Sequence, residues 1–151
     1  MKENNMKLDL ISLKVCKEKT LNYNKLRQFT SPEMVYRVVK KILDSTDREY
    51  LLVLNLNAQN QACSIQVCSI GSLTSTMVHP REIFKSAICT NSDKILLVHT
   101  HPSGCTKPSK SDIQTTQILL KASKILGIPL VDHVIVGDSY FSFAENGLLG
   151  E

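Results

Sequence analysis

Two histidines that directly follow an apolar run are the residues of this chain best placed to do chemistry. Ile95 to Val98 are four consecutive large apolar residues, which predict a strand buried on both faces, and His99 and His101 continue it. Side chains two positions apart on a strand point the same way, so both imidazoles can reach one point in space. This spacing favours a pair of metal ligands at the end of a central strand.

A carboxylate completes the candidate site. Pro102, Gly104 and Pro108 shape a loop after the strand, and Ser109-x-x-Asp112 opens an apolar-periodic run, so Asp112 is predicted in the first turn of a helix. Two imidazoles and one carboxylate leave a fourth position free. This is the arrangement of a catalytic zinc site, whereas structural sites usually close the tetrahedron with protein ligands. Water in the open position would be acidic enough to supply hydroxide near neutral pH.

The same residues also admit plainer interpretations. The histidines could be polar residues at the rim of a sheet, and Ser109 with Asp112 could form only a capping box, with Ser109 as N-cap. The cap is expected in either case, because it is compatible with metal binding. We predict that His99, His101 and Asp112 together hold Zn²⁺.

Four separated blocks of the sequence resemble a known family. His99-x-His101-Pro102 followed by Ser109-x-x-Asp112 resembles the JAMM (MPN-type) metalloprotease motif in composition and spacing. The wider set resembles the bacterial RadC family more narrowly. Its blocks are the run from His99 to Gly104, Pro108-Ser109, the run from Pro80 to Phe84 and the run from Leu130 to Gly137. The resemblance covers residues 30 to 150 and implies a JAMM/MPN-like fold, similar to that of cytidine deaminase.

The resemblance also implies a general base, and two glutamates compete for that role. A zinc hydrolase needs a carboxylate that takes a proton from the metal-bound water and later delivers one to the leaving amine. Glu82 lies 17 residues before His99, whereas Glu49 lies 50 residues before it, at the start of a strand expected to neighbour the central one. In JAMM enzymes the glutamate comes from a strand well upstream, and the run from Glu49 to Leu54 is similar. We therefore favour Glu49 and keep Glu82 as the alternative.

Three further residues near the site have weaker assignments. The resemblance implies that the Ser109 hydroxyl stabilises the tetrahedral oxyanion, in addition to capping the helix. His133, with Asp132 beside it, is predicted to be a core histidine or a residue that orients a ligand, rather than a ligand itself. Cys105 lies in the metal loop, where we expect it to face solvent; a role as an extra or inhibitory ligand is the alternative.

Composition indicates a single globular domain. A chain of 151 residues with 42% hydrophobic content is long enough to bury a core. No apolar run approaches the roughly 18 residues of a membrane span, and the first residues lack the apolar core of a signal peptide, so we expect a cytoplasmic protein without a membrane partner. Five cysteines are an odd number in no disulfide-like framework, which suits a reducing compartment. The net charge of +4 arises within residues 1–50, which is weak support for a nucleic-acid partner.

Periodicity predicts alternating helices and strands. Alternation over residues 8–15 predicts a half-buried strand, followed by a polar loop over residues 17–29. Helices are predicted to begin at Pro32, Pro80 and Asp112 and to end near Asp44, Asn91 and Ile125. Strands are predicted over residues 50–56, 62–70, 95–98, 131–136 and 140–143. The predicted buried faces of the second and third helices are Ile83, Phe84, Ala87 and Ile88, and then Ile113, Thr116, Ile118, Leu119, Ala122 and Leu126.

These elements predict an α/β fold with a mixed β-sheet flanked by helices on both sides, because hairpins occur among the alternating strands and helices. The predicted organisation has an N-terminal strand and polar extension over residues 1–29. A RadC-like metal-binding domain is expected over residues 30–151. The residues do not specify an oligomeric state.

The function favoured by these observations is that of a zinc-dependent metallopeptidase or isopeptidase, in which metal-bound water attacks an amide carbonyl of a protein or peptide substrate. The alternative is a DNA-repair-associated accessory protein with a structural or vestigial metal site, because RadC-like proteins carry a DNA-repair label. Fuller RadC members have a helix-hairpin-helix segment, but the first 30 residues here contain no glycine for such a hairpin. A zinc deaminase would need His-x-Glu and Pro-Cys-x-x-Cys, and neither is present.

Overall fold

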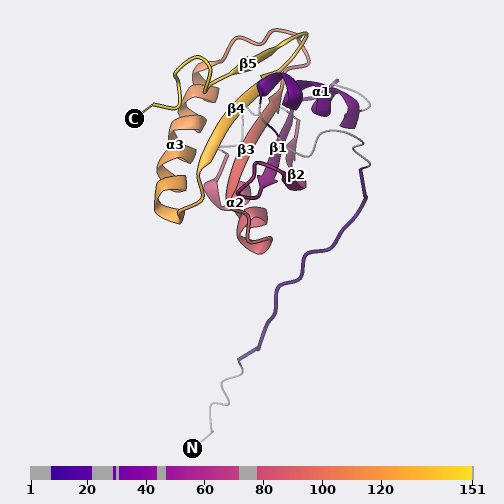
Figure 1. Cartoon of the computed structure of the whole chain (residues 1–151), viewed down its shortest axis with the longest axis vertical. Helices are drawn as coiled ribbons and strands as arrows, with labels where there is room; N and C mark the ends of the chain where they lie inside the picture. The colour runs from indigo at the N-terminus through magenta and orange to yellow at the C-terminus, as the bar shows by residue number, and fades with distance from the viewer. Residues whose placement is uncertain (1–7, 22–28, 30, 44–46, 72–77, 151) are drawn as a thin grey trace, which may run out of the picture.

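A computed structural model of the chain describes residues 8–21, 29, 31–43, 47–71 and 78–150. The helices and strands predicted from residue 31 onward are all present in it (Figure 1). Their bounds are α1 (Pro32–Ile42), β1 (Tyr50–Leu56), β2 (Ala62–Ile70), α2 (Pro80–Cys89), β3 (Lys94–Thr100), α3 (Lys110–Leu126), β4 (Leu130–Val136) and β5 (Tyr140–Ser142). No helix in the described ranges is long and apolar enough to cross a membrane.

The strands form one mixed sheet in the order β2-β1-β3-β4-β5, which makes β3 its centre. β1 pairs antiparallel with β2 and β3, β3 pairs parallel with β4, and β4 pairs antiparallel with β5. A parallel pair needs a crossover, which α3 supplies between β3 and β4. This sheet, with helices on both faces, confirms the predicted fold class and is consistent with a JAMM/MPN-like architecture.

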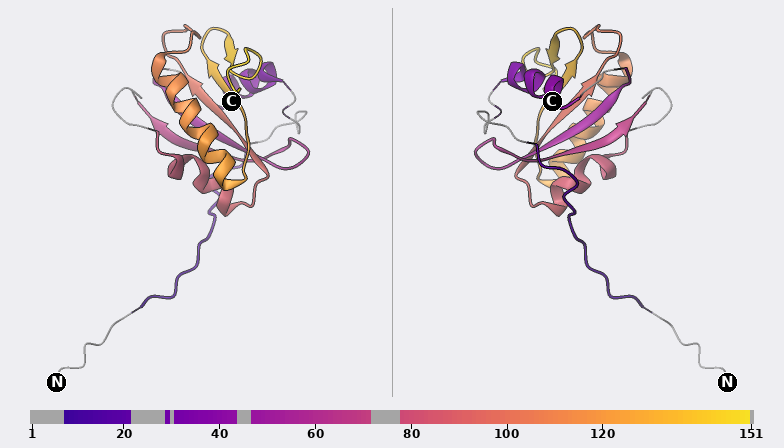
Figure 2. Two further views of the ribbon diagram at one scale, coloured as in Figure 1. Left: turned by 90° about the vertical axis from the view of Figure 1, so that its left-hand side faces the viewer. Right: turned by 90° about the vertical axis from the view of Figure 1, so that its right-hand side faces the viewer.

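Helices cover both faces of the sheet, with α1 on one side and α3 on the other (Figure 2). α1 packs through Val35 and Val39 against the face that carries Leu96. α2 and α3 pack through Phe84 and Leu119 on the opposite face. Because side chains alternate along a strand, the odd-numbered residues of β3 face α2 and α3. The imidazole at position 99 therefore points toward α3, whose first turn carries the predicted carboxylate.

Local hydrogen bonds and backbone conformations fix the ends of the helices. Ser31 caps α1, and its side-chain oxygen accepts a hydrogen bond from the Met34 N–H at 3.4 Å. His79 caps α2, where its Nδ1 accepts from the Arg81 N–H at 3.1 Å. Gly127 ends α3 in the left-handed conformation, with φ of +67°.

The buried face of α3 differs from the predicted one. Leu119 and Thr116 are buried as expected, and Ala122 packs against the core, but the other buried positions of this helix are Asp112 and Ser123. The sequence pattern favoured the largest apolar side chains. A helix that packs on a sheet buries only a narrow stripe of residues, and in α3 the four buried residues follow one another at intervals of four, three and four positions. The predicted core residues that are in fact exposed are Ile88 of α2 and Ile113, Ile118 and Leu126 of α3.

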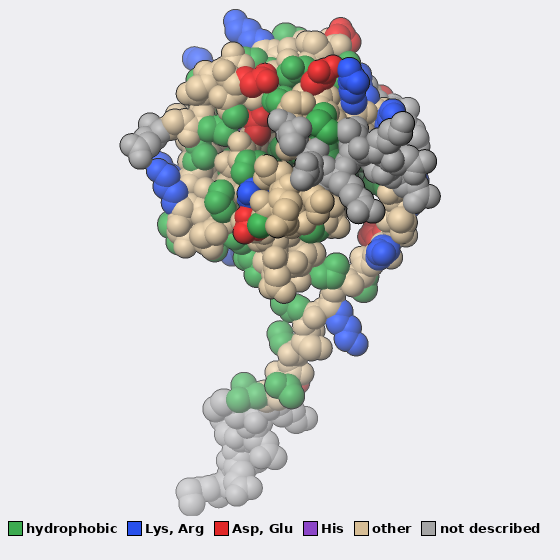
Figure 3. Space-filling model, in the orientation of Figure 1, with side chains coloured by type: hydrophobic (Ala, Val, Ile, Leu, Met, Phe, Trp, Pro, Cys, Tyr) green, Lys and Arg blue, Asp and Glu red, His purple; other side chains and the backbone are tan. Residues whose placement is uncertain are grey.

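The strand predicted over residues 8–15 is also wrong. Residues 8–21 contain no helix or strand, and their apolar side chains, such as Leu10 and Leu13, are exposed along a segment that is visible in Figure 3. Alternation alone does not make a strand, because a strand also needs a neighbour that takes up its backbone hydrogen bonds. Among the described strands, none pairs with this segment.

Candidate metal centre

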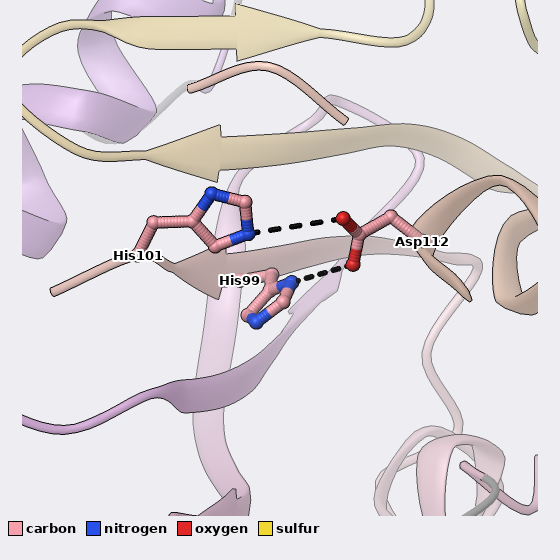
Figure 4. Close-up of side chains that lie close together, drawn as sticks. All are labelled: His99, His101 and Asp112. Atoms are coloured by element: carbon pink, nitrogen blue, oxygen red, sulfur yellow. Dashed lines mark ion pairs between the residues drawn. The ribbon is translucent and has the colours of Figure 1, made fainter. Parts of the chain in front are cut away.

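His99, His101 and Asp112 come together where β3 ends and α3 begins (Figure 4). Each offers one ligand atom, and these atoms lie within 4.8 Å of one another. His99 Nδ1 is 3.0 Å from Asp112 Oδ1, and His101 Nε2 is 3.7 Å from Asp112 Oδ2. The two imidazole rings meet edge to face, with 4.7 Å between their centroids. The three side chains thus converge as their spacing predicts.

Asp112 is positioned by a reciprocal cap at the start of α3. The Ser109 side-chain oxygen accepts a hydrogen bond from the Asp112 N–H at 3.1 Å, and Asp112 Oδ2 accepts one from the Ser109 N–H at 2.7 Å. This is the predicted capping box, with Asp112 in place of the more usual glutamate. Because one carboxylate oxygen is held by the cap, the other is directed at His99, so capping and metal binding are compatible.

His101 is oriented by the loop that follows it. Its Nδ1 lies 2.6 Å from the backbone carbonyl oxygen of Cys105. A carbonyl can only accept a hydrogen bond, so Nδ1 carries the hydrogen, and in the neutral ring Nε2, which faces Asp112, presents its lone pair. Such a partner on the second ring nitrogen is what a metal-binding histidine normally has. The Cys105 thiol itself is exposed, as predicted.

His99 provides the test of whether these residues fit a metal ion. Its side chain is buried, and neither ring nitrogen makes a well-formed hydrogen bond, although Nδ1 lies close to Asp112. Buried polar atoms without partners are unfavourable, and a bound cation would satisfy them. Imidazole nitrogen and carboxylate oxygen are ligands that suit Zn²⁺ and related divalent metals. The cluster therefore fits a metal ion.

The charge state of Asp112 also suits a cation. Burial raises the pKa of its carboxyl group, but the adjacent His99 imidazole and the hydrogen bonds from Ser109 outweigh burial and hold that pKa well below its usual range. The carboxylate is therefore ionised near neutral pH, which is the form that binds a metal.

His133 lies behind the site and reaches it through Thr116. The Thr116 hydroxyl donates to the Asp112 carbonyl at 2.7 Å, and its oxygen lies 2.7 Å from His133 Nδ1. A hydroxyl has one hydrogen, so Nδ1 must be the donor in the second bond. Burial, together with the nearby His99, lowers the pKa of His133 to about 3, so the ring is neutral near pH 7. His133 is thus a buried histidine that supports the backbone of Asp112.

The loop after His101 is pressed against the turn between β4 and β5. The Asp138 N–H donates to the Gly104 carbonyl at 2.9 Å. A Cβ on Gly104, whose φ is +79°, would overlap the Asp138 carboxylate, and a Cβ on Gly137 would overlap the Gly104 carbonyl. At Gly137 the obstacle is backbone, and at Gly104 the positive φ also favours glycine. Their contact fixes the loop that orients His101.

Replacing Gly104 by alanine is expected to destabilise the protein by roughly 2–4 kcal/mol, because backbone strain and overpacking add at this position. Gly127→Ala is the matched control, since its φ is also positive but a Cβ there meets nothing within 4 Å. The control should lose only about 1 kcal/mol. Denaturant unfolding of the metal-free proteins measures both values, and equal losses would contradict the proposed contact.

The two candidate bases occupy different surroundings. β1 pairs with β3 in a register whose last pair is Leu51 and His99, and the half-buried Glu49 lies two residues before Leu51, just outside β1. Glu82 lies on the exposed side of α2, with its Oε2 2.6 Å from Lys85 Nζ. The hydrogen bond from Lys85 lowers the pKa of Glu82. Neither carboxylate belongs to the three-residue cluster.

Sequence reasoning missed the residues that support the ligands. The Cys105 carbonyl, the Thr116 hydroxyl and the Thr100 hydroxyl all bond to groups at or beside the site. A backbone carbonyl has no signal in the sequence. Thr116 could have been recognised from the sequence, because it lies four residues after Asp112 and therefore on the same face of the helix.

Comparison with known proteins supports one family for this chain. The profile of the RadC-like JAB domain matches residues 29–148. A "UPF0758 protein" of Chlorobaculum parvum is 44% identical over 124 residues, which are 82% of this chain and 56% of that protein. A "UPF0758 protein" of Desulfitobacterium hafniense is 45% identical over 120 residues, covering 79% and 53% of the two chains. One from Methanosarcina mazei is 40% identical over 124 residues, covering 82% and 54%.

The chain thus spans about half the length of the curated relatives it matches. The family profile covers every residue of the cluster and of both elements that carry it. From its sequence, its fold and the cluster of His99, His101 and Asp112, this chain belongs to the RadC-like JAB domain family.

Proposed function

We propose that this protein is a zinc-dependent hydrolase of amide bonds, acting as a peptidase or isopeptidase. One observation carries the proposal: three ligand atoms lie within 4.8 Å of one another around a buried histidine whose ring nitrogens have no well-formed hydrogen bond. His99, His101 and Asp112 would hold the ion and leave a position open, which is the arrangement of catalytic zinc sites. When bound, zinc would supply Lewis acidity and lower the pKa of water.

Glu49 is the proposed general base. The register of β1 and β3 supports this assignment, because its last pair is Leu51 and His99, and continuing it by two residues would set residue 49 opposite His101. Continued one residue beyond the start of β1, alternation would put the Glu49 side chain on the face of Leu51, and Leu51 packs with the residues of β3 that precede His99. From there the carboxylate would take a proton from the attacking water and deliver it to the leaving amine.

Glu82 suits this role less well. Its carboxylate is tied to Lys85 on the exposed surface of α2, and that bond lowers its pKa. A general base works best when its pKa lies close to the working pH, so a lowered value weakens its ability to accept a proton. Glu82 is better explained as a favourable negative charge in the first turn of α2.

Ser109 is proposed to have two roles. As N-cap it accepts a hydrogen bond from the Asp112 N–H, and that bond leaves the hydroxyl hydrogen available. Ser109 is exposed beside the cluster, so its hydroxyl could donate to the oxyanion that forms at the attacked carbonyl. The same geometry gives Ser109 its structural role at the helix start.

The proposed substrates are proteins or peptides, because the motif of His99, His101 and Asp112 resembles that of the JAMM metalloproteases, whose target is an amide bond. We also propose a reducing, cytoplasmic compartment. The five cysteines are all free thiols, which is the usual state in such a compartment.

The test is metal analysis followed by an assay. Protein purified without a chelator or a polyhistidine tag should contain about one zinc per chain, as a three-ligand site predicts. It would then be assayed on a panel of fluorogenic peptides and isopeptide-linked conjugates. Cleavage should stop when zinc is removed with a chelator and return when zinc is added back.

Two outcomes would contradict the proposal. Protein that takes up no metal when zinc is offered at neutral pH would show that His99, His101 and Asp112 do not form a zinc site. Zinc-loaded protein that cleaves neither peptides nor isopeptides would favour the accessory-protein alternative with a structural metal. In that case salt-dependent binding of duplex DNA becomes the next measurement.

A further inference from the structure

The hydroxyl of Thr100 holds the backbone on both sides of Glu49. Thr100 Oγ1 accepts a hydrogen bond from the Tyr50 N–H at 2.8 Å and donates one to the Arg48 carbonyl oxygen at 3.3 Å. These two groups belong to the peptide units immediately before and after the Glu49 Cα. A single buried hydroxyl therefore restrains both backbone dihedral angles of Glu49.

This contact takes over where the backbone pairing ends. The register between β1 and β3 runs from Leu56 and Lys94 to Leu51 and His99, and Thr100 lies just beyond its last pair. Gly71, the residue after β2, adds a third restraint, because its N–H donates to the Glu49 carbonyl at 2.9 Å. Glu49 is thus anchored although it lies outside a regular strand.

We propose that Thr100 is a positioning residue for the general base of this site. The proposal rests on the proposed function, in which Glu49 moves protons between water and the leaving amine. Thr100 stands between the two histidine ligands, so its side chain points to the opposite face of β3 from theirs. The tripeptide His99-Thr100-His101 therefore provides two metal ligands on one face and a tether for the base through the middle residue.

A tether is needed because the base must stay within hydrogen-bond reach of its proton. Asp47 and Arg48, the two residues before Glu49, are exposed and form a bend. These two residues therefore lie outside the core, and the Thr100 hydroxyl holds Glu49 from the side of β3. A catalytic group that is displaced by about 1 Å can lower the reaction rate by up to about 100-fold. Loss of the tether should therefore affect turnover more than substrate binding.

The experiment compares three variants of the full chain. Thr100→Val removes the hydroxyl and keeps the shape, Thr100→Ser keeps the hydroxyl, and Thr90→Val is the matched control. Thr90 lies at the end of α2, where its hydroxyl bonds to the Ser86 carbonyl at 2.8 Å. Zinc content, amide hydrogen exchange at Tyr50 and steady-state kinetics on the substrate found in the panel are measured for each.

All variants should keep zinc, because none removes a ligand. In Thr100→Val the Tyr50 amide should exchange at least about fivefold faster, as expected for the loss of one hydrogen bond. Its kcat should fall about 10- to 100-fold with KM within about twofold of the parent. Thr100→Ser should restore both values, and Thr90→Val should change neither.

Two results would overturn the proposal, and neither is the same as failure of the proposed function. Unchanged Tyr50 exchange in Thr100→Val would show that the hydroxyl does not hold Glu49, whether or not the protein is an enzyme. Normal kcat in Thr100→Val, with activity lost in Glu49→Gln, would show that the tether is irrelevant to catalysis. Absence of zinc or hydrolysis in the parent would remove the catalytic part, because there would be no base to position.

Discussion

Replacing Glu49 with glutamine is expected to slow amide hydrolysis by at least about 100-fold while leaving zinc bound. Glutamine has nearly the same shape but cannot accept a proton, so the attacking water would have no base. Proton transfer by a positioned side chain typically contributes a factor of about 10² to 10⁴, and kcat should fall within that range. Zinc content should not change, because Glu49 is outside the cluster of His99, His101 and Asp112.

Glu82→Gln is the matched control for this experiment. The Glu82 side chain is exposed and pairs with Lys85, so its replacement should leave kcat within about twofold of the parent. Both variants would be assayed on the same substrate at several pH values. Activity that survives in Glu49→Gln but disappears in Glu82→Gln would assign the base to Glu82.

Asp112→Asn should lose the metal without unfolding the start of α3. Asparagine can still accept the hydrogen bond from the Ser109 N–H that Asp112 accepts at 2.7 Å, so the capping box is preserved. The substitution removes the negative charge that the site offers to a cation. Loss of an orienting partner alone typically costs about 10- to 100-fold in metal affinity, and loss of a ligand should exceed that range.

Two further variants separate the ligand from the cap. Ser109→Ala should keep zinc but lose about 1 kcal/mol of stability, because the Asp112 N–H loses its acceptor. Asp112→Ala should lose both the metal and the cap. Zinc content by elemental analysis and denaturant unfolding of the metal-free proteins report these effects independently. Full zinc occupancy in Asp112→Asn would exclude the carboxylate as an essential ligand.

The sequence alone determined the elements from residue 31 onward and the convergence of the three candidate ligands. Both depend on short-range regularities. Two histidines separated by one residue must share a face of a strand, and a serine three residues before an aspartate forms a cap that directs the carboxylate. The apolar run from Ile95 to Val98 required burial on both faces, and this placed the histidines at the centre of the sheet.

The polar interior of α3 could not be predicted in the same way. Apolar periodicity favoured Ile113 and Ile118, but both are exposed, while Asp112 and Thr116 are buried. Periodicity identifies a core by hydrophobicity, whereas these polar side chains are buried because hydrogen bonds to partners distant in sequence satisfy them. In residues 8–15 the local pattern predicted an element that does not form. Apolar and polar residues alternate there, but none of the described strands pairs with this segment.

Only the tertiary structure revealed how the site is supported and where the two candidate glutamates lie. Spacing along the chain left Glu49 and Glu82 as alternatives, because either could be brought to the site by folding. The antiparallel register of β1 and β3 ends at Leu51 and His99, two residues from Glu49 and from His101, and α2 leaves Glu82 in an ion pair at the surface. Register and side-chain partners arise from contacts between segments far apart in sequence, so a local pattern cannot specify them.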